Sequence, residues 1–357
     1  MKNVKVETND NSYDVFIDSG ILKDTGKIIA RVHEKCACVV VTDDIVKPLY
    51  FETVKLSLEE NGFSVKCFEF KNGEGSKNIS TLSDLLEYCA NYGLTRTDLI
   101  VALGGGVVGD LAGFAAAVYL RGIDFVQVPT TLLAAVDSSV GGKTGIDLVA
   151  GKNLAGAFHQ PLTVICDPNT LKTLSKKVFA DGLSESIKYA MIEDREMFEM
   201  LLNGGFIAKI ENGIEKCVKI KADIAGKDEF ESGLRKLLNF GHTIGHAVEK
   251  LSGFDITHGR AVAIGMACIT ASCEALGLCE PCIDELISLL KKNDLPYVSP
   301  YSAEAMAQAA LSDKKRSGDK ITLVIPKKIG KCTLHTISIN EMQSFIKAGE
   351  SLLQGRR

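Results

Sequence analysis

Short apolar strands alternate with helical segments through the first half of this 357-residue chain. The predicted strands are Lys2–Thr8, Ser12–Ile17, Cys36–Thr42, Phe63–Phe70, Asp98–Leu103, Phe125–Val128 and Thr163–Cys166, and the predicted helices are Ile45–Glu60, Ile79–Tyr92 and Val107–Tyr119. Strands that alternate with helices favour a parallel sheet covered on both faces. The pattern therefore predicts a Rossmann-like α/β fold for this half, with Lys2–Thr8 and Ser12–Ile17 as an additional hairpin.

The pattern changes after Asp167–Pro168. From about Lys176 to Leu311 the apolar residues follow a helical period, with almost no strand candidates. One late hairpin is predicted from Lys320–Ile325 and Lys331–Ile337. We therefore expect an α/β domain at residues 1–174 and a mostly helical domain at residues 175–357.

Composition excludes several classes of protein. The net charge of −4 and the pI near 5.9 provide no broad basic face for nucleic acid. The N-terminal residues lack the apolar core of a signal peptide, and the longest apolar runs are too short to span a membrane. Eleven cysteines without a secretion signal indicate reduced thiols, so we expect a cytoplasmic protein. Cys279 and Cys282 form an isolated C-x-x-C pair that we interpret as apolar filling.

A glycine-rich loop, Gly104–Asp110, follows one predicted strand and begins a helix. Gly104, Gly106 and Gly109 satisfy the G-x-G-x-x-G pattern, which brings backbone amides close to a pyrophosphate. Such turns also occur without a ligand, and the usual ribose-binding acid about 20 residues later is missing. Asp43 and Asp44, which close the Cys36–Thr42 strand, are better placed to bind a ribose.

A second polar segment, Val128–Gly145, is rich in hydroxyls and glycine and is followed by Gly151–Gly156. Gly141-Gly142-Lys143-Thr144 is only the tail of a Walker A motif, so the segment does not favour a nucleotide triphosphatase. Lys143 and Lys152 together with backbone amides would suit a phosphate group. We interpret the segment as a polar loop, and a solvated loop without a ligand is the alternative interpretation.

Three of the six histidines fall within seventeen residues. His242 and His246 are one helical turn apart and can share a face, and His258 opens the segment Thr257–Arg260. Asp181–Tyr189 reads as the start of a helix that carries Glu185 and Lys188 on one face. Glu185, His242 and His258 could form a zinc site with open positions for substrate oxygens. A packed or solvated histidine pair is the alternative.

Five segments together resemble the motifs of the 3-dehydroquinate synthase family, in family order and spacing over essentially the whole chain: Gly104–Asp110, Val128–Thr144, Gly182–Tyr189, Leu238–Glu249 and His258–Met266. The resemblance implies conversion of 3-deoxy-D-arabino-heptulosonate 7-phosphate to 3-dehydroquinate and phosphate in the shikimate pathway of chorismate and aromatic amino acid biosynthesis. It implies transient oxidation by NAD, β-elimination of phosphate, re-reduction, ring opening and an intramolecular aldol closure. It also implies one divalent zinc or cobalt ion and a cytoplasmic homodimer.

The resemblance assigns roles to individual residues of this chain. The implied metal ligands are Glu185, His242 and His258. The implied positions around NAD are Asp43, Glu74, Lys77, Gly105, Gly106, Val107, Asp110, Thr130, Thr131 and Lys152. The implied groups around the substrate's hydroxyls and carboxylate are Asp137, Lys188, Lys221, Arg235 and Asn239. The implied phosphate pocket contains Lys143, Asn153, Lys314 or Lys315, and His246, which can also shuttle a proton. Arg121 is implied to reach the active site of the neighbouring subunit.

The sequence departs from the family at Arg260, where glutamate is usual after His-Gly. This charge reversal near a ligand either alters a contact of the metal site or rearranges a surface ion pair. Three alternatives remain at this stage. They are a metal- and NAD-dependent polyol dehydrogenase of the glycerol dehydrogenase type, a cyclase acting on sedoheptulose 7-phosphate, and a nucleotide-binding regulator without catalysis.

Overall fold

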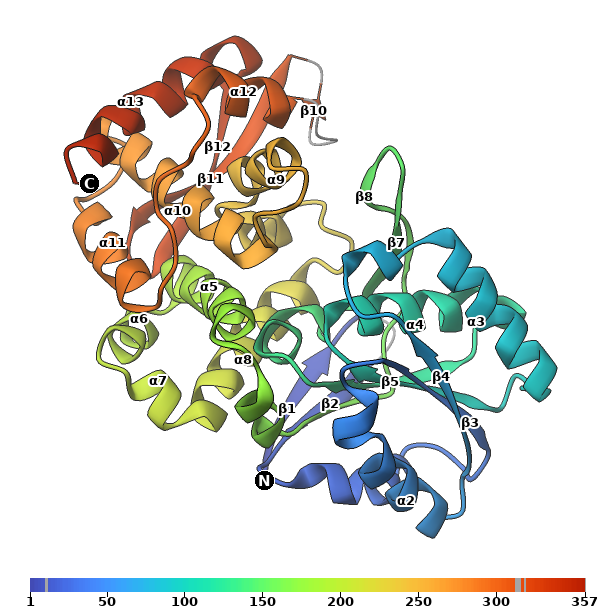
Figure 1. Ribbon diagram of the computed structural model, residues 1–357. Helices are drawn as coiled ribbons and strands as arrows, with labels where there is room; N and C mark the ends of the chain where they lie inside the picture. Colours follow the sequence, from blue (N-terminus) through green and yellow to red (C-terminus); the bar gives the residue numbers. More distant parts are fainter. Residues whose placement is uncertain (10–11, 312–315, 318, 357) are drawn as a thin grey trace. The chain divides into compact units, whose positions relative to one another are not determined.

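The computed structural model describes residues 1–9, 12–311, 316–317 and 319–356 (Figure 1). Two compact units divide the chain: Met1–Ser175 with Lys221–Phe230, and Lys176–Ile220 with Glu231–Arg357. The return of residues 221–230 to the first unit differs from the predicted division at 174/175. Residues 221–230 contact the first unit at two points. Gly226 lies so close to β1 that a Cβ on it would be 2.5 Å from the Glu7 carbonyl oxygen, and Glu229 accepts a hydrogen bond from Gln160.

The first unit contains a seven-stranded sheet in the order β1-β2-β9-β6-β5-β3-β4. Its strands are β1 (Lys2–Glu7), β2 (Ser12–Ile17), β3 (Ala37–Asp43), β4 (Ser64–Phe70), β5 (Leu99–Gly104), β6 (Asp124–Pro129) and β9 (Thr163–Cys166). Only the β1–β2 pair is antiparallel, and every other pair in this sheet is parallel. The predicted α/β class with a mainly parallel sheet is confirmed.

Helices cover both faces of this sheet (Figure 1). They are α1 (Thr25–Ile29) and α2 (Glu52–Glu60) on one face, and α3 (Ile79–Tyr92) and α4 (Gly106–Val118) on the other. Successive residues of a strand point to opposite faces, so Val40 packs with the α1–α2 cluster while Val39 and Val41 pack with the α3–α4 cluster. Burial on both faces explains why β3 reads as a continuous apolar run.

The strand order reverses between β3 and β5. The chain leaves β3 for β4 on one side and returns to β5 on the other, so the carboxyl ends of β3 and β5 flank a topological switch point. Ligands of open α/β sheets bind at such points. Asp43 ends β3 and Gly104 ends β5, which places the acidic pair and the glycine-rich loop side by side.

The segment predicted as a polar loop contains two paired strands, β7 (Lys143–Leu148) and β8 (Gly151–Phe158). The prediction of an irregular loop was wrong here. Gly145 and Gly156 allow the backbones to approach closely, since a Cβ on Gly156 would lie 2.1 Å from the Thr144 carbonyl oxygen. The glycines that suggested a loop are therefore what this hairpin requires.

The second unit is mostly helical around one buried helix, α10 (His258–Ala275). Helices α5, α9, α11 and α13 all pack against α10, whose residues from Ala261 to Cys273 are all buried and apolar or small. The remaining elements are α5 (Lys176–Glu193), α6 (Arg195–Leu202), α7 (Gly205–Ala208), α8 (Ile210–Lys227), α9 (His242–Leu251), α11 (Ile283–Lys292), α12 (Ala303–Leu311), β10 (Arg316–Ser317), β11 (Lys320–Lys328), β12 (Lys331–Ser338) and α13 (Met342–Gln354). The predicted late hairpin is thus present as β11–β12.

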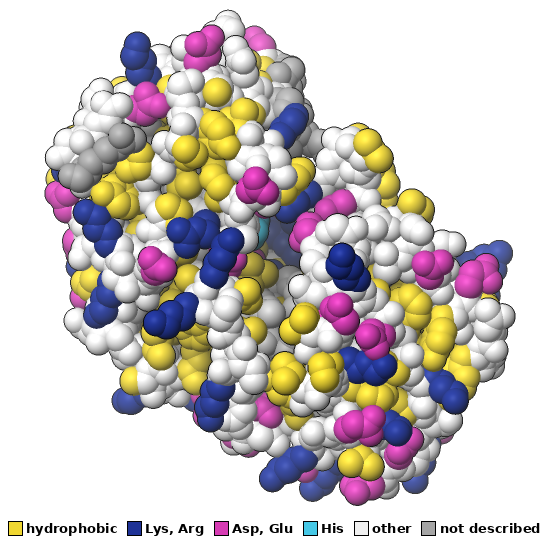
Figure 2. Space-filling model, in the orientation of Figure 1, with side chains coloured by type: hydrophobic (Ala, Val, Ile, Leu, Met, Phe, Trp, Pro, Cys, Tyr) yellow, Lys and Arg dark blue, Asp and Glu magenta, His cyan; other side chains and the backbone are white. Residues whose placement is uncertain are grey.

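Surface charges are mixed. Figure 2 shows basic and acidic side chains interspersed over the visible face. None of the helices among the described residues combines the length and apolar character needed to cross a membrane.

Candidate functional site

Helices α9 and α10 cross at unusually short range. Gly241, at φ +78°, immediately precedes α9, and a Cβ on Gly265 of α10 would lie 1.9 Å from the Gly241 carbonyl oxygen. Any larger residue at position 265 would separate the helices. This contact joins the start of α9 to the middle of α10, and the His242 and His258 ring centroids lie 5.2 Å apart.

A second contact fixes α10 against α5. The Asp181 carboxylate accepts hydrogen bonds from the Thr257 hydroxyl at 2.8 Å and from the Arg260 backbone amide at 3.1 Å. A Cβ on Gly259 would lie 2.4 Å from the Asp181 Cα, so only glycine fits between the helices. Asp181 was predicted to start a helix, but α5 begins at Lys176, and Asp181 instead caps α10. The result is that His258 lies beside Glu185, one turn after Asp181.

The metal triad, defined as Glu185, His242 and His258, is assembled at this junction. Glu185 Oε1 lies 3.4 Å from His258 Nε2 and 3.7 Å from His242 Nε2, and the three ligand atoms all lie within 4.8 Å of one another. Glu185 is completely buried and also pairs with the Lys188 ammonium group. Neither of its oxygens has a hydrogen bond of ordinary geometry among the described residues. A divalent ion would satisfy this carboxylate, so the donor set fits a metal.

The electrostatics of His258 agree with this fit. Burial alone would lower the pKa of this imidazole, but the nearby Glu185 and Glu249 carboxylates outweigh burial and raise its pKa to about 10. The surroundings therefore stabilise positive charge at this position.

His246 belongs to a second group of possible metal ligands, with Glu249 and His258. Its ring centroid lies 5.4 Å from that of His242 and 6.2 Å from that of His258. Sequence reasoning did not single out Glu249, although its position seven residues after His242 places both on one face of α9. That spacing is the signal that could have identified it.

Arg235 and Asn239 lie on the 3₁₀ segment η7 (Leu234–Asn239), which packs against α5. The Arg235 guanidinium is buried, and its Nε lacks a hydrogen-bond partner among the described residues. Asn239 donates a hydrogen bond to Glu231. A buried guanidinium suits an anionic ligand group.

In the first unit, a lysine–carboxylate cluster, defined as Lys77, Asp110, Glu74 and Lys152, lies near the glycine-rich loop. Lys77 Nζ lies 2.7 Å from Asp110 and 3.7 Å from Glu74, and Lys152 Nζ lies 3.8 Å from Glu74. Burial opposes the charged form of Lys77, but Asp110 and Glu74 outweigh burial and raise its pKa. These groups thus neutralise one another without a ligand.

Lys221 and Asp137 form a second pair in this unit. The Lys221 ammonium group donates to the Asp137 carboxylate and, at 2.8 Å, to its backbone carbonyl. Asp137 lies in the short π-helical segment η5 (Ala134–Ser138), and Lys221 is buried on α8. The structure thus brings together two residues that are 84 positions apart in the sequence.

The glycine-rich loop leaves polar groups available at the switch point. Gly105 precedes α4, and no side chain caps the helix there. Within the described residues, the Thr130 hydroxyl is buried without a hydrogen-bond partner, and so is the Thr42 hydroxyl at the end of β3. Thr131 accepts a hydrogen bond from the Ala134 amide. An uncapped helix N-terminus beside unsatisfied hydroxyls fits a dinucleotide.

Asp43 is engaged within the protein. Its Oδ1 accepts hydrogen bonds from the Ile45 and Val46 amides, and its Oδ2 accepts one from Asn72. Its carboxylate therefore orders the turn after β3. Gly106 and Val107 lie in the first turn of α4, and both are half-buried.

The remaining predicted residues lie at exposed turns and strands. Lys143 begins β7, and Asn153 lies in β8 at φ +53°. Arg121 is exposed in a left-handed turn at φ +71°, after α4. Lys314 and Lys315 lie outside the described residues.

The Arg260 guanidinium donates to the Asp294 carbonyl at 3.0 Å, so its charge is directed away from the triad.

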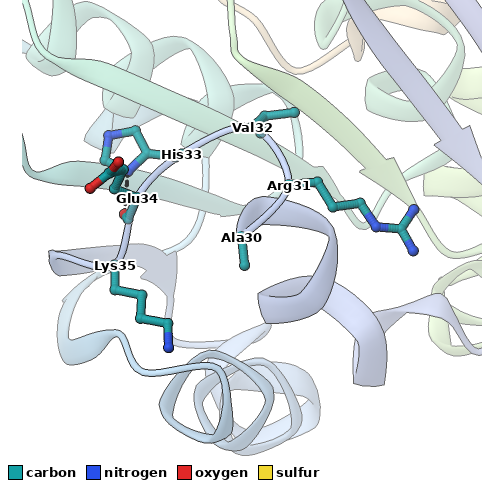
Figure 3. Close-up of a pocket in the computed structure, with 6 residues that line it drawn as sticks. All are labelled: Ala30, Arg31, Val32, His33, Glu34 and Lys35. Carbon is teal, nitrogen blue, oxygen red and sulfur yellow. Dashed lines mark hydrogen bonds between the residues drawn. The ribbon is translucent and has the colours of Figure 1, made fainter.

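Two other features do not join these clusters. A surface hollow is lined by Ala30–Lys35, where Figure 3 shows Arg31 and Lys35 pointing apart. All eleven cysteines are free thiols, including Cys279 and Cys282, and burial raises the pKa of Cys282 to about 12. Among the described residues, neither metal-ligand group contains a cysteine.

Sequence comparison identifies two family models in the chain. Residues 67–181 match the 3-dehydroquinate synthase N-terminal model, and residues 182–316 match the 3-dehydroquinate synthase C-terminal model. The chain is also 43% identical over 354 residues to the 3-dehydroquinate synthase of Clostridium acetobutylicum, covering 97% of this chain and 99% of that protein.

Two solved structures of other enzymes are similar to this chain over nearly its whole length. A 2-deoxy-scyllo-inosose synthase complexed with carbaglucose-6-phosphate, NAD+ and Co2+ is 25% identical with a TM-score of 0.87, covering 97% of this chain and 99% of that one. The 2-epi-5-epi-valiolone synthase of Streptomyces hygroscopicus subsp. jinggangensis 5008, with NAD+ and Zn2+ bound, is 25% identical with a TM-score of 0.89, covering 98% of both chains.

Proposed function

This chain belongs to the 3-dehydroquinate synthase family, and we propose that it carries out that family's reaction. The reaction converts 3-deoxy-D-arabino-heptulosonate 7-phosphate to 3-dehydroquinate and phosphate, as a lyase of the shikimate pathway. The observation that supports it most is the buried Glu185 carboxylate beside two histidines, which has no hydrogen bond of ordinary geometry among the described residues.

Glu185, His242 and His258 would hold one divalent zinc or cobalt ion through one carboxylate oxygen and two Nε2 atoms. When bound, such an ion supplies a Lewis acid that lowers the pKa of a substrate hydroxyl. Lys188, held against Glu185, adds positive charge where an alkoxide would develop.

The edge of the sheet near Gly105, Gly106 and Thr130 would bind NAD, which supplies a hydride acceptor when bound. The uncapped start of α4 would face the pyrophosphate, and the Thr42 and Thr130 hydroxyls would bind polar groups of the dinucleotide. Asp43 would shape this edge through its hydrogen bonds to the Ile45 and Val46 amides.

The substrate's anionic groups would be bound by cationic side chains. Arg235, whose guanidinium is buried, is suited to a carboxylate. Lys221 would position hydroxyls together with Asp137, its ion-pair partner. His246, Lys143 and Asn153 would bind the phosphate group, and His246 can carry a proton to or from it.

We also propose a cytoplasmic homodimer. Arg121 is exposed on a left-handed turn after α4, with exposed Val118 and Leu120 beside it. This surface would let Arg121 reach a neighbouring copy. The free thiols support a reducing compartment.

The function can be tested by supplying the heptulosonate phosphate with zinc and catalytic amounts of NAD, and measuring phosphate, 3-dehydroquinate and NADH. Phosphate release that requires NAD without accumulating NADH is expected. Steady NADH formation from glycerol, with no phosphate release, would instead identify a polyol dehydrogenase. Turnover of sedoheptulose 7-phosphate in preference to the heptulosonate would identify a different cyclase.

A further inference from the structure

Each imidazole of the metal triad has one ring nitrogen toward Glu185 and one directed elsewhere. In His242, Nε2 faces Glu185 and Nδ1 lies 3.2 Å from the Phe240 carbonyl oxygen. In His258, Nε2 faces Glu185 and Nδ1 lies 3.3 Å from Glu249 Oε2. A neutral imidazole carries one N–H and one lone pair. The partner of the outer nitrogen therefore determines which nitrogen is available to a metal.

Glu249 is suited to fix this choice for His258. It lies two turns after His242 on α9, and only 2% of its surface is exposed. An ionised carboxylate can only accept hydrogen bonds, so His258 must present an N–H at Nδ1. Glu249 also differs from the neutral Phe240 carbonyl that faces His242, because its charge makes the imidazole a stronger base and offsets part of the metal's charge.

We propose that Glu249 is a positioning residue for the metal centre, which holds His258 in the tautomer that leaves Nε2 for the divalent ion. The proposal rests on the proposed metal-dependent function and adds a residue that no sequence motif had assigned to it.

The same atoms allow a competing arrangement. His246, Glu249 and His258 also bring ligand atoms within 4.8 Å of one another. There Glu249 would be a ligand, and His258 would bind the ion through Nδ1. One neutral imidazole cannot serve both arrangements at once. The triad with Glu185 is favoured, because Glu185 is completely buried and neither of its oxygens has a hydrogen bond of ordinary geometry among the described residues, whereas Glu249 is hydrogen-bonded to His258 Nδ1.

Zinc affinity of the full-length protein, measured by competition with a chromophoric chelator, tests the proposal. Glu249→Ala should raise the Kd for zinc by about 10- to 100-fold, as removal of such a partner typically does. Glu249→Gln should restore most of the affinity, because its amide oxygen still accepts the Nδ1–H bond. The matched control His246→Ala should leave the Kd essentially unchanged, because it removes neither a ligand of the triad nor the partner of His258 Nδ1.

An unchanged Kd in Glu249→Ala would overturn the proposal, and so would equal weakening in Glu249→Ala and His246→Ala. Far-UV circular dichroism of the metal-free variants shows whether each is folded. If Glu249→Ala does not fold, Glu249→Gln still tests the proposal, because it keeps the side-chain volume.

The tautomer itself can be read in the wild-type protein. ¹⁵N NMR of histidine-labelled, zinc-loaded protein should show His258 protonated at Nδ1 and metal-bound at Nε2. Metal at Nδ1 would refute the proposal. Zinc binding with these features but no phosphate release would refute the proposed reaction and leave the role of Glu249 intact.

Discussion

The metal triad and the lysine–carboxylate cluster use similar residues but differ in how their charges are balanced. Lys77, Asp110, Glu74 and Lys152 pair with one another, so the first unit's cluster is neutralised by the protein itself. Glu185 is buried against two imidazoles and Lys188, and among the described residues neither of its oxygens has a hydrogen bond of ordinary geometry. The difference indicates that one cluster shapes a binding surface, whereas the other is completed by an ion.

The largest expected effect is the loss of a ligand from the triad. His242→Ala should lower zinc affinity by at least about 100-fold and reduce phosphate release to below about a thousandth, because the ion loses one of three protein ligands. Chelator competition and phosphate assays measure both quantities. His246→Ala is the control and should retain zinc. If His246→Ala loses its zinc, the assignment of ligands is wrong.

Gly259→Ala should have the next largest effect, because its Cβ would meet the Asp181 backbone at 2.4 Å. We expect a loss of about 3 kcal/mol in the free energy of unfolding, with weaker zinc binding as His258 moves from Glu185. Urea unfolding measures the loss. Gly75→Ala is a matched control, since its Cβ would meet nothing within 4 Å. Equal stability of the two variants would contradict this account of the α5–α10 junction.

Lys77→Met tests the self-neutralised cluster. Removing the buried ammonium takes the close cation from Asp110 and leaves Glu74 with Lys152, so we expect a loss of about 2 kcal/mol in the free energy of unfolding without NAD. Adding Asp110→Asn should recover part of that loss, which a double-mutant cycle in urea measures. Zinc affinity should not change. A full, additive loss in the double variant would show that the two residues are not coupled.

Arg260→Glu should have the smallest effect. The Arg260 side chain donates to the Asp294 carbonyl and is not directed at the triad. We expect a stability change within about 0.5 kcal/mol and an unchanged zinc Kd. Steady-state phosphate release and chelator competition check this expectation. A tenfold change in zinc affinity would show that the reversed charge acts on the metal centre.

Local sequence patterns predicted the elements whose buried residues follow a regular spacing along the chain. Strands such as Thr163–Cys166 are buried on both faces, and α3 carries the regular apolar spacing of an amphipathic helix, so their predicted bounds match the structure. The β7–β8 hairpin was missed because its glycines serve close backbone contact, which resembles a loop in the sequence.

Close backbone contacts at glycines also limited how much of the candidate site could be predicted from the sequence. Helical spacing indicated that His242 and His246 share a face, but the approach of Glu185 and His258 depends on glycine contacts among α5, α9 and α10. The orienting contact of Glu249 depends on the same approach, and so does the capping role of Asp181. No sequence period encodes these distances.

Anomalous diffraction at the zinc absorption edge, on crystals of the zinc-loaded protein, tests the difference between the two clusters most directly. The account predicts one strong peak, bounded by Glu185 and by the Nε2 atoms of His242 and His258, and none at the lysine–carboxylate cluster. A peak among His246, Glu249 and the Nδ1 atom of His258 would contradict it.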